Sequence, residues 1–162
     1  MLTQFAKRSD EYRGRFAPSP SGLLHFGSLI AAVSSFFQAK SLGGKWLLRI
    51  EDIDPPREQQ GAAAAILTSL EAHGLYWDET PLYQSQQHEL YNDILSDLVK
   101  QGEAYYCTCT RKMIKTLGGY YQGHCSQLNN SAQDAALRLK NETPVRHFVD
   151  EIQGDVDIDS QL

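Results

Sequence analysis

The 162-residue chain carries 15 lysines and arginines against 20 aspartates and glutamates, a net charge of −5, and 41% of its residues are hydrophobic. This acidic balance disfavours a generally basic nucleic-acid coat, although local basic patches can still bind a nucleic-acid backbone. The length predicts one domain with one core, and no apolar stretch has the length of a membrane span or the pattern of a signal peptide, so we expect a cytoplasmic protein without a membrane partner.

The stretch Arg15–Ser28, R-F-A-P-S-P-S-G-L-L-H-F-G-S, is expected to organise the chain. Residues 15–17 end a predicted strand, the prolines and glycine that follow impose a bend, and helical spacing begins at Phe26. A glycine-containing turn that leads into a helix presents unpaired N–H groups and the positive end of the helix dipole, which suits phosphate. His25 stands at that entrance, where an imidazole can donate to phosphate oxygens, and Gly27 permits close approach of a ligand.

A helix over residues 26–40 is followed by a predicted strand at Lys45–Ile50, whose continuous apolar character is typical of a central strand in a parallel sheet. The helix residues expected to pack in the core are Phe26, Leu29, Ile30, Val33, Phe36 and Phe37. Ligands of such sheets bind beyond the carboxyl ends of the strands, so Glu51 is expected beside the bend. A carboxylate there can pair with the ammonium of an amino acid, and Arg15, at the end of the adjacent strand, can pair with a carboxylate side chain.

Two further helices are predicted after this strand. Asp54 precedes two prolines and is interpreted as the N-cap of a helix over 56–73. Trp77, in the loop that follows, is interpreted as a packing residue. Ser85 is expected to cap the third helix, which Gly102 ends.

The odd number of cysteines and their spacing favour a metal over disulfides in a reducing cytoplasm. The three cysteines are Cys107, Cys109 and Cys125. Tetrahedral zinc needs a fourth ligand, for which the candidates are Tyr120, Tyr121, His124 and a distant residue. Ligand chemistry favours His124, because imidazole is a common zinc ligand and phenolate is rare. Geometry leaves the choice open, because His124 adjoins Cys125 and neighbouring side chains diverge.

The remaining segments carry weaker signals. Residues 104–110 are expected to form a strand or a tight knuckle, and residues 112–116, K-M-I-K-T, a solvated basic turn. Alternating residues predict two strands over 136–140 and 145–149.

Two blocks resemble the glutamyl branch of the class I aminoacyl-tRNA synthetases. H-F-G-S at His25–Ser28 stands where this family has its HIGH tetrapeptide, with a serine in place of the second histidine, and R-I-E-D-I-D-P-P-R at Arg49–Arg57 is similar to a second block. The resemblance implies that the nucleotide is handled by His25, Gly27 and Ser28. It also implies that the amino acid is contacted by Arg15, Phe16, Ala17, Pro18, Ser19 and Glu51.

The cysteine region resembles one group within this branch, the enzymes that attach glutamate to queuosine in the anticodon of tRNA(Asp). Their pattern of Cys-x-Cys, eleven residues, Tyr, three residues and Cys is matched by Cys107, Cys109, Tyr121 and Cys125. The resemblance implies a structural Zn²⁺ with Tyr121 as its fourth ligand. It implies as substrates L-glutamate, ATP with Mg²⁺, and tRNA(Asp) that carries queuosine.

The resemblance also implies a fold and a domain organisation. We expect an α/β, Rossmann-type class I catalytic domain with a parallel sheet and flanking helices, its first half over residues 1–103. Residues 104–162 are expected to form a small zinc-binding insertion and the start of the return strands. The family's second half, with its KMSKS loop, is expected to be absent and the chain alone to be inactive. Two alternatives stay open: a non-catalytic tRNA- or zinc-binding fragment, and a fragment of a glutamyl-tRNA synthetase.

Overall fold

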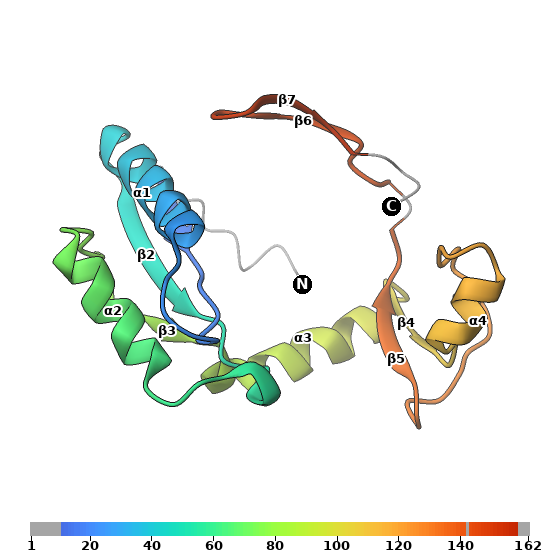
Figure 1. Cartoon of the computed structure of the whole chain (residues 1–162). Coiled ribbons are helices and arrows are strands. Elements are labelled where there is room, and N and C mark those ends of the chain that lie inside the picture. The colour runs from blue at the N-terminus through green and yellow to red at the C-terminus, as the bar shows by residue number, and fades with distance from the viewer. Residues whose placement is uncertain (1–10, 142, 159–162) are drawn as a thin grey trace. The chain divides into compact units, whose positions relative to one another are not determined.

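A computed structural model of the chain describes residues 11–141 and 143–158 (Figure 1). These residues form two compact units that divide after His88. The first unit confirms the expected α/β class, because it holds a three-stranded parallel sheet with helices. The division lies earlier in the chain than the domain boundary predicted between residues 103 and 104, and that boundary stays a prediction.

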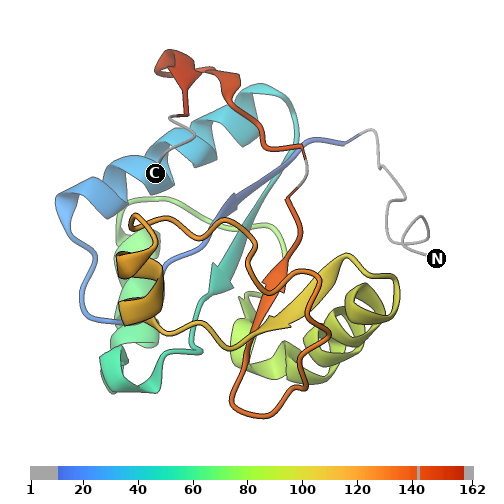
Figure 2. The same ribbon diagram turned by 90° about the vertical axis from the view of Figure 1, so that its right-hand side faces the viewer.

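The parallel sheet has the strand order β1-β2-β3. The elements of the first unit are β1 (Arg13–Phe16), α1 (Phe26–Ser41), β2 (Lys45–Ile50), a 3-10 helix (Pro55–Arg57), α2 (Ala62–Ala72), β3 (Leu82–Tyr83) and a second 3-10 helix (Gln84–Gln87). Strands β1 and β2 lie side by side (Figure 2), with Gly14 paired to Trp46 and Phe16 to Leu48. The helix predicted over 26–40 and the strand predicted over 45–50 are therefore confirmed.

Trp46 is the centre of the core of this unit. Its side chain is fully buried, its ring stacks on that of Phe16 with 6.3 Å between centroids, and Phe36 of α1 meets it edge-on at 5.3 Å. The indole N–H donates to Ser35 Oγ at 2.9 Å, so its one polar group is satisfied. The buried residues of the cluster are Phe16, Ala32, Ala39, Trp46, Leu48, Ile66, Leu70 and Leu75, and Trp77 packs against them as expected.

Only part of the apolar surface of α1 reaches this core. Leu29, Val33 and Phe36 pack against it, but the expectation that Phe26, Ile30 and Phe37 are core residues is wrong, since they are exposed. The reason is angular: at about 100° per residue these three positions lie on a neighbouring side of the helix. The backbone of α1 lies very close to β1, where a Cβ on Gly14 would be 3.0 Å from the Cβ of Ala39.

Two predicted helix starts differ from the structure. The helix expected over 56–73 is divided, because Gly61 adopts a left-handed φ of +79° directly before α2. Asp54 precedes the first 3-10 helix, but its carboxylate accepts from Arg57 Nε at 2.6 Å and caps no backbone N–H. Ser85 does not cap the third helix, because it lies inside the second 3-10 helix and bonds to Asp52.

The second unit contains two antiparallel strand pairs. Its first helix, α3 (His88–Lys100), begins at the last residue of the first unit. The elements that follow are β4 (Ala104–Cys107), α4 (Arg111–Thr116), β5 (Ala136–Leu139), β6 (His147–Asp150) and β7 (Gly154–Asp157). Strand β4 pairs with β5, and β6 with β7. The basic turn expected over 112–116 is instead the helix α4, which begins after Thr110 because the threonine Oγ accepts from Met113 N–H at 3.2 Å. In the part of the chain that the structure describes, no helix combines the length and apolar character that a bilayer span requires.

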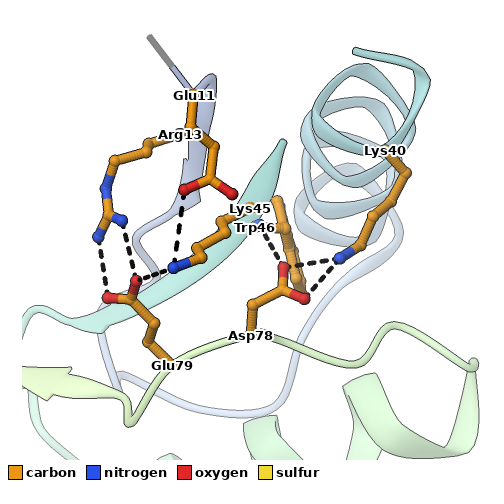
Figure 3. Close-up of polar contacts among 7 residues, drawn as sticks. All are labelled: Glu11, Arg13, Lys40, Lys45, Trp46, Asp78 and Glu79. Carbon is orange, nitrogen blue, oxygen red and sulfur yellow. Dashed lines mark hydrogen bonds and ion pairs between the residues drawn. The ribbon is translucent and has the colours of Figure 1, made fainter. Parts of the chain in front are cut away.

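Two adjacent carboxylates join the amino ends of β1 and β2 to the segment before β3 (Figure 3). Glu79 accepts a forked pair of hydrogen bonds from Arg13, both 2.8 Å long, and another at 3.2 Å from Lys45. Asp78 accepts from Trp46 N–H at 2.6 Å and from Lys40 Nζ at 2.6 and 2.7 Å. These contacts hold the end of the sheet opposite to the bend.

The Glu79 contacts predict a dependence of stability on pH. The hydrogen bonds from Arg13 and then from Lys45 hold the pKa of Glu79 at about 2, below its ordinary 4.5. The stabilisation from this carboxylate is therefore present above about pH 4.5 and is lost as the pH falls towards 2. In urea unfolding, we expect Glu79→Gln to be less stable than wild type at neutral pH, with the difference shrinking through this window.

The matched control is Glu71→Gln, which changes an exposed carboxylate on α2. Its difference in unfolding free energy from wild type should not vary over the same pH range. A constant difference for Glu79→Gln would show that the ion pairs do not contribute to folding.

Candidate functional site

The bend between β1 and α1 is held by two later segments of the chain. Pro18 accepts a backbone hydrogen bond from Glu51 N–H at 3.0 Å, and Pro20 accepts one from Gln59 N–H at 2.9 Å. Gly22 adopts a φ of +151°, a conformation that side chains disfavour, and so lets the chain turn towards α1. The bend predicted from its prolines and glycine is therefore a fixed loop beside the carboxyl end of β2.

His25 is the N-cap of α1. Its Nδ1 accepts from Ser28 N–H at 3.3 Å, and its Nε2 lies 3.0 Å from Ser28 Oγ. Because Nδ1 is an acceptor, the neutral ring carries its proton on Nε2 and donates it to the serine hydroxyl. A Cβ on Gly27 would lie 3.2 Å from the Cε1 of His25, so glycine here gives the imidazole room to fold over the start of the helix.

The larger of the two cavities at the bend is open and has a volume of about 430 Å³. The predicted site residues that line it are Phe16, Ala17, Pro18, Ser19, His25, Gly27 and Ser28. The first N–H groups of α1 have no acceptor inside the helix, and its dipole adds partial positive charge. An imidazole, serine hydroxyls and a helix N-terminus together suit an anionic ligand.

A smaller cavity of about 110 Å³ adjoins this pocket and contains Glu51. Ser19 and Ser21 line both cavities. The same loop therefore borders the cavity of the Glu51 carboxylate and the cavity of the His25 imidazole. Glu51 Oε1 lies 3.8 Å from Arg49 Nε, at the end of β2. The sequence-based expectation that Glu51 falls beside the bend agrees with this placement.

Arg15 lines neither of these two cavities. Along β1, Gly14 and Phe16 are buried, whereas Arg13 and Arg15 are exposed on the other face. Because side chains alternate along a strand, Arg15 points away from the face that carries the core. The structure therefore brings together all the predicted nucleotide and amino-acid residues except Arg15, whose role stays a prediction.

Asp52 is a residue of this region whose contacts sequence reasoning did not find. Its carboxylate accepts from Ser85 N–H at 2.9 Å and from Ser85 Oγ at 2.6 Å. Burial raises the pKa of Asp52, but these hydrogen bonds outweigh it and the pKa lies below its usual value. The contact joins the segment after β2 to the segment after β3, and no local pattern could reveal it because the two residues are far apart in sequence.

The second unit brings the three cysteines together as predicted. The Sγ atoms of Cys107, Cys109 and Cys125 all lie within 4.8 Å of one another, and those of Cys109 and Cys125 are 3.5 Å apart. All three thiols are free. Tetrahedral zinc with Zn–S bonds of about 2.3 Å requires sulfurs roughly 3.8 Å apart. The donor set therefore fits zinc in both ligand type and spacing.

The geometry favours Tyr121 over His124 as the fourth donor. The Tyr121 hydroxyl accepts from Cys125 N–H at 3.0 Å, whereas His124 is exposed and is not part of the cluster. Burial raises the pKa of the Cys107 thiol, but hydrogen bonds from Tyr121, the Cys109 backbone and Arg138 together lower it to about 6. In the same cluster, the hydrogen bond to Cys125 raises the pKa of Cys109 to about 11, and burial raises the pKa of Tyr121. Cys107 is therefore the group of the cluster that ionises most readily.

Comparisons with known proteins agree on one family. Residues 11–162 match the family described as tRNA synthetases class I (E and Q), catalytic domain. A Glutamyl-Q tRNA(Asp) synthetase of Photobacterium profundum is 56% identical over 162 residues, which are 100% of this chain and 52% of the relative. One from Colwellia psychrerythraea is 59% identical over 156 residues, covering 93% of this chain and 50% of the relative.

A solved structure gives the same result. The glutamate tRNA ligase of Elizabethkingia meningosepticum, in complex with its amino acid, is similar with a TM-score of 0.72 and 25% identity, over 91% of this chain and 36% of that chain. This chain spans about half the length of the curated relatives it matches. With the match over residues 11–162, these likenesses show that the chain belongs to the class I tRNA synthetases of the E and Q group, as part of their catalytic domain.

Proposed function

We propose that the chain serves the ATP-dependent activation of L-glutamate and its transfer to queuosine in tRNA(Asp). The observation that carries the activation step is His25 at the N-cap of α1, over a pocket of about 430 Å³ whose loop also reaches Glu51. The similar solved structure supports glutamate as the amino acid. The names of the relatives from Photobacterium and Colwellia support queuosine in tRNA(Asp) as the acceptor.

In the first step, an oxygen of the glutamate α-carboxylate bonds to the α-phosphorus of ATP, bound with Mg²⁺, and pyrophosphate leaves. His25, Ser28 and the N–H groups that open α1 stabilise the negative charge that grows on the phosphate oxygens. Glu51 pairs with the substrate ammonium. The pairing of Arg15 with the side-chain carboxylate rests on the sequence resemblance alone, because Arg15 lies on the exposed face of β1. These groups act by positioning and electrostatics, and no side chain needs to become a nucleophile.

In the second step, a hydroxyl of queuosine takes the glutamyl group from the adenylate and AMP leaves. Charging assays on queuosine-containing tRNA(Asp) and on tRNA(Glu) separate this function from that of a glutamyl-tRNA synthetase. Glutamylation of tRNA(Glu) alone would show that the acceptor is wrong, although the activation site would stand.

We further propose that Cys107, Cys109, Tyr121 and Cys125 hold a structural Zn²⁺. Four protein ligands leave no open coordination position, so the metal would link the end of β4 to the segment around Cys125 without entering the chemistry. The spacing of the three sulfurs supports this assignment.

Removal of the His25 imidazole tests the activation site. In a form of the protein that catalyses glutamate-dependent ATP–pyrophosphate exchange, we expect His25→Ala to lower kcat/KM for this exchange by about 10²- to 10³-fold, the usual cost of losing one positioned donor to developing charge. The matched control is His88→Ala, which removes an exposed imidazole at the start of α3 and should leave exchange unchanged.

The wild-type chain must be measured in the same experiment. Exchange that is equal in wild type and His25→Ala would remove His25 from the mechanism. No exchange by the wild-type chain alone would agree with the expectation that this chain is inactive by itself and with the alternative of a non-catalytic tRNA- or zinc-binding fragment.

Zinc removal tests the metal site. We expect the protein to hold one zinc per chain, and we expect a chelator to make residues 105–125 sensitive to limited proteolysis, because the metal replaces a packed core in this segment. Cys125→Ser should lower the zinc content and give the same proteolysis without a chelator. Unchanged cleavage of this segment after zinc removal would contradict a structural role.

A further inference from the structure

Arg138 lies on the same face of the β4–β5 pair as the cysteine cluster. The antiparallel register places Arg138 opposite Tyr105, and Ala136 opposite Cys107. Because side chains alternate along each strand, Tyr105, Cys107 and Arg138 share one face. The Cζ of Arg138 lies 4.1 Å from the centroid of the Tyr121 ring, within the range of a cation–π contact. One side chain from β5 therefore contacts the tyrosine proposed as a ligand.

We propose that Arg138 is a positioning residue for the zinc centre, which stacks on Tyr121 to orient its hydroxyl and balances the charge of the ligand set. This inference rests on the zinc site proposed above and adds to it a residue outside the four ligands. Neither the spacing of the cysteines nor that of Tyr121 indicates an arginine on a strand that follows later in the chain.

The charge of the centre gives the first reason. Three thiolates, one phenolate and Zn²⁺ carry a net charge of −2, which is costly where water is partly excluded. The Arg138 guanidinium is charged at every working pH and brings the local sum to −1.

The burial of Arg138 gives the second reason. The side chain is half-buried, and its Nε is fully buried without a hydrogen-bond partner among residues 11–141 and 143–158. A buried guanidinium nitrogen without a partner is destabilising by itself, so the position needs compensation from nearby negative charge. A metal centre with a net negative charge, in contact through Cys107 and Tyr121, supplies it.

The planarity of the guanidinium gives the third reason. A flat cation can stack on an aromatic face and still donate from its edge, whereas a lysine ammonium is a point charge without a plane. Residues of this kind next to metal ligands usually change metal affinity by about 10- to 100-fold. Lysine at position 138 should therefore restore charge but not orientation.

The experiment compares zinc binding by wild type, Arg138→Met, Arg138→Lys and Arg111→Met. Arg111 is an exposed arginine at the start of α4 and serves as the matched control. Zinc affinity is measured by competition with a chromophoric chelator, and the ionisation of Tyr121 by the near-ultraviolet difference spectrum on metal loading. We expect about 10- to 100-fold weaker binding and a reduced tyrosinate signal for Arg138→Met, an intermediate loss for Arg138→Lys, and no change for Arg111→Met.

A second comparison separates orientation of Tyr121 from general folding. In a Tyr121→Phe background, we expect the loss caused by Arg138→Met to be smaller, because the contact that it removes is already gone. An equal loss in both backgrounds would overturn the orienting role, and wild-type affinity in Arg138→Met would overturn the whole inference. If Arg138→Met does not fold, Arg138→Lys decides, since wild-type affinity and tyrosinate signal in that variant would also overturn it.

The outcomes also distinguish the two proposals. A wild-type chain that binds no zinc would overturn the zinc site together with the role of Arg138. A wild-type chain that binds zinc tightly, with Arg138→Met equal to it, would leave the zinc site standing and remove only Arg138.

Discussion

The first unit depends on the burial of Trp46 between β1 and α1. Its indole stacks on Phe16, meets Phe36 edge-on and donates to Ser35, and its backbone N–H donates to Asp78. A buried tryptophan of this kind contributes about 3–5 kcal/mol relative to alanine. Because the same side chain contacts a strand and a helix, it sets the position of α1 on the sheet, and with it the place where the helix begins.

The candidate activation site follows from that placement. The start of α1 lies beside the carboxyl ends of the strands, where the bend is tied down through Pro18 and Pro20. Most of the binding groups are therefore backbone groups whose position the core fixes. The His25 ring is held by its hydrogen bonds with Ser28, and Gly27 leaves the space that the ring occupies. The contacts of Asp78 and Glu79 secure the opposite end of the sheet, and the contact of Asp52 with Ser85 joins the segments that follow β2 and β3.

The second unit has less apolar burial to stabilise it than the first. It has few large buried side chains around the cysteines, and the loop between Cys109 and Cys125 is mostly exposed. Apolar burial gives such a segment little stability, which agrees with the proposal that a metal joins its two ends. The family match spans residues 11–162 and so covers both units, and the cysteine pattern is one reason for the narrower group named in the proposal.

The sequence by itself determined the features that depend on neighbouring residues. The periodicity of residues 26–40 and the apolar run at Lys45–Ile50 correspond to α1 and β2, and the spacing of the cysteines matches a cluster of three sulfurs. Ligand chemistry favoured His124 over Tyr121 and geometry left the choice open, whereas the family resemblance favoured the tyrosine. Only the fold shows that the Tyr121 hydroxyl faces the cysteines.

Tertiary structure decided the features whose partners are distant in sequence. β3 has two residues, too few for any periodicity, and exists because β2 offers an edge for parallel pairing. Asp52 meets Ser85, and Arg138 meets Tyr121, only after the strands have paired. The exposure of the Arg15 side chain was also decided by packing, because α1 covers the opposite face of β1. Local patterns determine the helix, the strand and the ligand spacing, whereas contacts between segments require the packing that the whole chain provides.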